Sequence, residues 1–226
     1  MKNKWNRDKY IEEFLKRKNE QEAQPMEAYM KHKFPFLGIK SPIRKEIIKD
    51  FLISYHLPND EDLFEETWAI YTLSHREFQY AAIALLSKRM KYLTVKDLPY
   101  IEKLIIEKSW WDSVDSIAPT IIGEIIKKDR VNGELIMQQW SNSKNMWLIR
   151  SAILHQLKYK NDTNEKLLME IILKHADSNE FFIQKAIGWV LREYAKSNVE
   201  FVKHFVQTHD LKPLSKREAM KNILLI

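Results

Sequence analysis

The segment SWWDSVDSIAPT places two tryptophans beside two aspartates. If Ser109 caps a helix, Trp111 and Asp115 stand at i and i+4 on one face, and Trp110 turns toward the core. A tryptophan beside a carboxylate is unusual on a solvated helix face, so a chemical role is one interpretation. The alternative is a core tryptophan, with Asp112 and Asp115 favoured in the first turn by the helix dipole.

A single base interrupts the apolar segment NMWLIRSAILHQL, at Arg150. A buried arginine needs a carboxylate or phosphate partner, and the fork of its guanidinium suits both. Two interpretations therefore stay open: an internal ion pair, for which Asp115 is a candidate partner, and a contact with a bound phosphate.

A third segment, IQKAIGWVLREYAK, carries a cationic and aromatic stripe at i, i+4, i+7 and i+11: Lys185, Trp189, Arg192 and Lys196. An aromatic ring among bases suits a nucleic-acid backbone. A solvated face with a half-buried tryptophan explains the pattern equally well. Gly188 costs about 1 kcal/mol of helix propensity relative to alanine, which indicates a close approach at this point.

Two further helix starts combine a capping serine with bases: Ser41 with Pro42, Arg44 and Lys45, and Ser215 with Lys216, Arg217 and Glu218. In the second group the S-x-x-E spacing predicts a capping box. Free backbone N–H groups beside bases suit phosphate. Each group is also explained as an ordinary helix cap.

Several kinds of chemistry are excluded. The chain has no cysteine, so disulfides, thiol nucleophiles and thiolate metal sites are ruled out. Its histidines form no i, i+4 pair, and no Walker A, G-x-S-x-G or G-x-G-x-x-G motif occurs. Any reaction must use carboxylate, arginine, aromatic rings and water, and we expect no metal and no cofactor.

The elements that position these residues have helical periodicity almost everywhere, with short breaks between them. An alanine recurs in the middle of helical segments at steps of 36, 34 and 34 residues, at Ala82, Ala118, Ala152 and Ala186. Such a repeat is typical of an α-solenoid of antiparallel helix pairs with a concave face. A simple helical bundle would also give helix pairs of similar length.

Length and charge complete the sequence-based expectations. The 226 residues suit a single domain over 1–226, and monomer is the default. The net charge is +6, and residues 181–226 hold eight Lys or Arg against four acids, which hints at a polyanionic partner. No signal peptide or membrane-spanning run is visible, so cytoplasm, with nucleoid association through DNA, is the expected location.

Together these segments, with PMEAYMKHKFPFLGI and LSKREA, resemble the AlkD family of alkylpurine DNA glycosylases over about residues 25–223. The resemblance implies a HEAT-like repeat fold that holds duplex DNA in its concave face. It also implies excision of purines alkylated at N3 or N7, such as 3-methyladenine and 7-methylguanine. The lesion would be captured without a deep base pocket.

The resemblance also assigns residues. The family's active-site tryptophan and aspartate fall on Trp111 and Asp115, its arginine on Arg150 and its second cleft tryptophan on Trp189. A tyrosine near the lesion falls on Tyr29. Two alternatives remain, a non-catalytic binder of distorted DNA and a protein scaffold. An unpaired carboxylate facing DNA would argue against both, because it repels phosphate.

Overall fold

The computed structural model describes residues 1–221 and 223, and its regular structure is helical. In this part of the chain the β structure is one isolated bridge, between Asn3 and Tyr55. The predicted all-α class is confirmed. Residues 1–89 and 90–226 form two compact units. The expectation of one domain over residues 1–226 stays a prediction.

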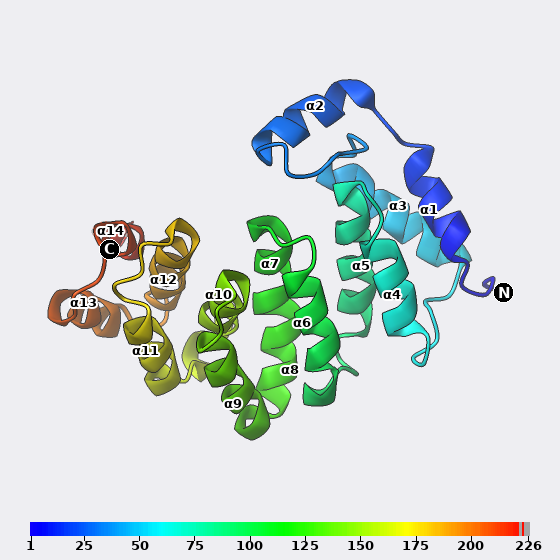
Figure 1. Cartoon of the computed structure of the whole chain (residues 1–226). Coiled ribbons are helices and arrows are strands. Elements are labelled where there is room, and N and C mark those ends of the chain that lie inside the picture. Colours follow the sequence, from blue (N-terminus) through cyan, green and yellow to red (C-terminus); the bar gives the residue numbers. More distant parts are fainter. Residues whose placement is uncertain (222, 224–226) are drawn as a thin grey trace. The chain divides into compact units, whose positions relative to one another are not determined.

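Unit 1 contains five helices: α1 (Arg7–Leu15), α2 (Glu20–Tyr29), α3 (Ser41–Ser54), α4 (Leu63–Tyr71) and α5 (Arg76–Arg89). An antiparallel pair, α4 and α5, lies side by side (Figure 1). Aromatic rings form much of the core, because Tyr10 packs on Phe14 and Phe51 at centroid distances of 5.4 and 4.9 Å. All three side chains are buried.

The loop between α2 and α3 is held by one buried carboxylate. Glu77, in the first turn of α5, accepts hydrogen bonds from the amides of Leu37, Gly38 and Ile39 at 2.9–3.0 Å. Gly38 has φ +84°, and a Cβ there would stand 1.9 Å from the carbonyl oxygen of Asn19, so only glycine fits. Glu77 thereby ties the loop directly before α3 to the first turn of α5.

Unit 2 consists of the remaining elements: η1 (Val95–Asp97), α6 (Leu98–Ile106), α7 (Trp111–Ile117), η2 (Ala118–Ile122), α8 (Gly123–Lys128), α9 (Arg130–Ser141), α10 (Met146–Leu154), η3 (Lys160–Asp162), α11 (Glu165–Lys174), α12 (Phe181–Tyr194), α13 (Val199–Thr208) and α14 (Pro213–Met220). Here α7 packs on α10, α10 on α12, and α12 on α14 (Figure 1). The preceding helices α6, α9, α11 and α13 each pair with a member of this row.

This stacking of neighbour on neighbour is the α-solenoid arrangement that the repeat predicts. Three of the repeat alanines, Ala118, Ala152 and Ala186, are at most 1% exposed and lie on successive members of the row. Ala82 occupies the matching place in the pair α4 and α5 and is also buried. Small residues at buried positions of this kind allow helices to approach closely.

One helix of the row is irregular directly after Asp115. The segments α7, η2 and α8 run on without a break, and η2 has π-helical geometry. Pro119 lies within η2 and has no N–H to donate to the carbonyl four residues earlier, which is that of Asp115. A widened turn is a common response to such a missing bond.

Candidate functional site

The centre of the site is an ion pair between two helices of the row. Arg150 on α10 donates to both carboxylate oxygens of Asp115 on α7, from Nε to Oδ1 at 2.7 Å and from Nη2 to Oδ2 at 2.8 Å. This two-point geometry fixes both side chains. It confirms the internal ion pair, one of the two interpretations that the sequence left open for Arg150.

A third helix also holds Arg150. Its Nη1 donates to the backbone carbonyl of Phe182, in the first turn of α12. The side chain of Arg150 is only 5% exposed, whereas that of Asp115 is 16% exposed. The guanidinium therefore joins three helices from inside, and the carboxylate remains the more accessible partner.

Burial and charge act in opposite directions on Asp115. Burial raises the pKa of this carboxyl. Arg150 lowers that pKa through its hydrogen bonds and its charge, and the charge of nearby Asp112 raises it. The net direction is upward. Arginine stays protonated throughout the accessible pH range, and the carboxylate beside it holds a proton more readily than an ordinary aspartate does.

Aromatic side chains surround this pair. Trp111 lies one helical turn before Asp115 on α7 and is partly buried. Trp110, which precedes the helix, packs on Trp147 and Phe182 at centroid distances of 5.9 and 5.2 Å. Trp147 and Phe182 contact each other at 5.1 Å. Trp147 and Phe182 thus lie on two of the three helices joined by Arg150, and Trp110 directly precedes the third, α7.

The stripe on α12 is largely occupied by an internal contact. Glu218 on α14 pairs with Lys185 at 2.9 Å and with Arg192 at 3.0 Å. Both bases lower the pKa of Glu218, chiefly through the Lys185 hydrogen bond. Trp189 lies between these bases in sequence and is partly exposed. The cationic face is therefore real, but one acid offsets part of its charge.

Gly188 explains how α12 and α14 come so close. A Cβ at this position would stand 2.4 Å from the Cβ of Glu218 and 3.0 Å from the carbonyl oxygen of Ser215. The close approach expected at Gly188 is confirmed, and its partner is another helix of the same unit.

The remaining predicted bases of unit 2 are more exposed. Lys196 pairs with Glu193 at 2.7 Å, and Lys216 lies 3.7 Å from Asp210. Arg217 is exposed and forms no ion pair within residues 1–221 and 223. Exposed pairs of this kind are weak and are screened by salt, so these bases are available to an anion.

The predicted serine caps are wrong at three helices, because each helix begins at another residue. The N-caps of α3, α7 and α14 are Lys40, Trp110 and Lys212. Ser41 is the first residue of α3 and caps nothing. The hydroxyl of Ser109 donates back to the carbonyl of Ile105 at 2.8 Å.

The predicted capping box is also wrong. Ser215 is buried within α14, and its hydroxyl donates to the carbonyl of Gln184 on α12 at 3.1 Å. Glu218 pairs with α12 as described above. The proline at position 213 starts the helix three residues earlier than the pattern suggests.

The other candidates lie in unit 1. Tyr29 ends α2 with 69% of its surface exposed. Arg44 donates to the carbonyl of Ile39 at 3.0 Å, and its guanidinium lies 4.2 Å from the ring centre of Tyr80. Lys45 is exposed and forms no ion pair in the part of unit 1 that the structure describes.

Sequence reasoning missed the roles of Trp147, Phe182 and Glu218. Trp147 lies three residues before Arg150, a helical spacing that could have indicated a shared face. The Phe182 contact uses a backbone carbonyl, which no side-chain pattern reveals. No group of three or more histidine, aspartate or glutamate side chains able to hold a metal occurs among the described residues.

The fold and the site define a class: a helical repeat protein whose stacked helices present a buried arginine, its carboxylate partner and several indole rings. Comparison with known proteins adds the family. Residues 10–223 match the family described as DNA alkylation repair enzyme, and the chain belongs to that family.

Two solved structures are similar. One is named "Predicted DNA alkylation repair enzyme from Enterococcus faecalis"; it is 36% identical, has a TM-score of 0.84, and the match covers 90% of this chain and 95% of that one. The smu.31 protein from Streptococcus mutans UA159 is 18% identical, with a TM-score of 0.60 and coverage of 79% and 96%, and supports the fold alone. No curated protein matches. Among the described residues no helix has both the length and the apolar character needed to cross a bilayer.

Proposed function

We propose that this protein is a monofunctional DNA glycosylase that hydrolyses the N-glycosidic bond of N3- and N7-alkylated purines in duplex DNA. The observation that carries the proposal is the carboxylate of Asp115, held at both oxygens by Arg150 and more exposed than its partner. Membership of the DNA alkylation repair enzyme family supports the same function.

The chemistry requires little from the protein. A purine alkylated at N3 or N7 is a cation, and it leaves as a neutral base when it takes the electron pair of the C1′–N bond. Positive charge then grows on the deoxyribose, as in other glycoside hydrolyses. A water oxygen bonds to C1′ and releases a proton. The enzyme therefore needs to stabilise a cation and to position one water.

Asp115 suits both tasks. Its negative charge, fixed before the reaction begins, stabilises the developing sugar cation without reorganisation. Arg150 is a positioning residue that keeps the carboxylate oriented. A direct phosphate contact by Arg150 would require its remaining N–H groups to become more accessible than its 5% exposed side chain allows.

Trp111 and Trp189 would pack against the deoxyribose and its backbone, where their electron-rich faces favour a cation. The other candidates would bind the DNA: Tyr29, Ser41, Arg44, Lys45, Lys185, Arg192, Lys196, Lys216 and Arg217. We assign no lysine to the chemical step, so the proposed reaction is hydrolysis without a Schiff base or strand cleavage.

The test replaces the carboxylate. Asp115→Asn should slow base release from methylated duplex DNA about 10²–10³-fold, the usual cost of losing one preorganised electrostatic group. Freed bases and abasic sites are both measured under single-turnover conditions. The affinity for a duplex with a stable abasic analogue should stay within a few-fold of that of the unaltered protein. Asp112→Asn is the matched control, because it removes a neighbouring carboxylate that Arg150 does not hold. Equal rates for Asp115→Asn and the unaltered protein would contradict the proposal.

One observation favours a second candidate function, a non-catalytic binder of distorted DNA. Asp115 is paired rather than bare, so its repulsion of phosphate is largely offset and no longer argues against simple binding. The same assay separates the two functions, because a binder would show affinity for modified duplex without any release of bases.

A further inference from the structure

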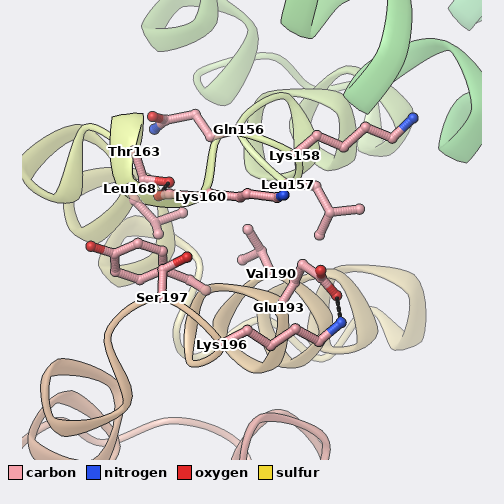
Figure 2. Close-up of a pocket in the computed structure, with 11 residues that line it drawn as sticks. Gln156, Leu157, Lys158, Lys160, Thr163, Leu168, Val190, Glu193, Lys196 and Ser197 are labelled. Atoms are coloured by element: carbon pink, nitrogen blue, oxygen red, sulfur yellow. Dashed lines mark hydrogen bonds and ion pairs between the residues drawn. The ribbon is translucent and has the colours of Figure 1, made fainter.

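A cavity of about 530 Å³ lies between the chain that follows α10 and the last turns of α12 (Figure 2). Three lysines line it, Lys158, Lys160 and Lys196, together with one acid, Glu193. Its volume is within the usual range of ligand sites. None of the residues to which we assign the chemical step lines it.

The charges of the lining do not cancel. Glu193 is paired with Lys196 at 2.7 Å. Lys158 donates to the neutral hydroxyl of Thr120 at 2.8 Å. Within residues 1–221 and 223 the ammonium of Lys160 has no hydrogen-bond or ion-pair partner, and its side chain extends across the cavity toward Leu157 (Figure 2). The Lys158 side chain extends away from the other lining side chains, so the ammonium of Lys160 is the cation that remains in the described lining for an anionic ligand (Figure 2).

The backbone holds Lys160 in an unusual conformation. Its φ is +54°, in the left-handed region that favours glycine. The hydroxyl of Thr163 donates to the carbonyl of Lys160 at 2.8 Å, and Arg130 donates to the carbonyl of Asp162 at 2.7 Å. The loop is thus fixed from both sides, which holds a lysine at a position where glycine would be favoured.

We propose that this cavity binds a backbone phosphate of the DNA strand within a few nucleotides of the lesion. The inference rests on the proposed function, which places Trp189 at the lesion. Val190, which directly follows Trp189 on α12, lines the cavity, and Lys196 lies two residues beyond the end of that helix.

The decisive variant is Lys160→Gly, which removes the ammonium and suits the left-handed backbone, so the fold should not suffer. Lys166→Ala is the matched control, because it removes one exposed lysine from α11 of the same helix pair. We expect Lys160→Gly to weaken binding of a duplex with an abasic analogue about threefold to tenfold at low salt. The slope of log affinity against log salt should fall by about 0.9, and Lys166→Ala should change neither.

A second measurement identifies the ligand. Neutral methylphosphonates are placed one at a time within five nucleotides on either side of the abasic analogue. One of them should weaken binding by the unaltered protein and leave binding by Lys160→Gly unchanged. If every methylphosphonate affects both proteins equally, the proposal is overturned.

Two other outcomes would also overturn it. If inorganic phosphate raises the melting temperature of the unaltered protein but not of Lys160→Gly, and no methylphosphonate has an effect, the cavity binds free phosphate. A lower melting temperature for Lys160→Gly with unchanged DNA affinity would show a structural role only. If bases are never released but the methylphosphonate effect persists, the glycosylase proposal fails and the phosphate site stands.

Discussion

Replacing Gly188 by alanine tests the packing that positions α12. The added Cβ would lie 2.4 Å from the Cβ of Glu218, 3.0 Å from the carbonyl oxygen of Ser215 and 3.2 Å from the amide nitrogen of Ala219. The first distance is roughly 1 Å shorter than an ordinary carbon–carbon contact. Two of these atoms belong to the backbone and the third is bonded directly to it, so α14 must move away as a whole.

Two effects of opposite sign compete in this variant. Alanine gains about 1 kcal/mol of helix propensity over glycine. Overpacking a tight contact costs about 1–3 kcal/mol, and here the upper part of that range applies, because no flexible side chain can rotate out of the way. We therefore expect Gly188→Ala to lose about 1–2 kcal/mol, or about 2–8 °C in melting temperature for a chain of this size.

The assay is thermal unfolding followed by circular dichroism, with Lys185→Ala as the control. That control weakens the same helix contact through a partly exposed ion pair, without a clash, and should cost less than about 1 kcal/mol. A melting temperature for Gly188→Ala equal to or above that of the unaltered protein would refute the reasoning, because only the gain in helix propensity would then be at work.

Two further predictions follow from titratable groups. Burial lowers the pKa of His155 to about 4 from an ordinary value of 6.5. As the pH falls, this residue therefore binds a proton in the unfolded chain before it does so in the folded protein. The free energy of unfolding, measured in urea, should fall by about 3 kcal/mol between pH 7 and 4. His155→Gln should remove most of that pH dependence, and an unchanged slope would show that other groups cause it. Glu218→Gln removes the acid that offsets Lys185 and Arg192, so duplex affinity should rise about twofold to fivefold at low salt and the gain should vanish at high salt. Glu200→Gln on α13 is its control, and affinity that is the same in both variants would mean that DNA does not reach this face of α12.

Much of the fold could be predicted because the relevant signals are local. Helical periodicity depends on residues three and four apart, and the recurring alanines mark positions where any partner helix must come close. The same local geometry places Trp111 and Asp115 on one face of α7. Repeats of this kind contact mainly their neighbours, so a pattern along the chain translates directly into a stack.

The caps could not be predicted in the same way. A serine hydroxyl near a helix start chooses among several nearby backbone groups, and tertiary packing decides between them. Ser109 turns back to the preceding helix, and Ser215 donates to a different helix altogether. Both patterns are typical of caps in sequence, yet neither residue caps its helix.

The sequence by itself determined the helical class, the repeat and the residue types available for chemistry, because these depend on composition and on spacing within one helix. Only the tertiary structure decided their partners. Arg150 reaches Asp115 across 35 positions of the chain and Glu218 reaches Lys185 across 33, and both contacts exist because helices distant in sequence pack side by side. Burial in that packing gives the pair its geometry and raises the pKa of Asp115.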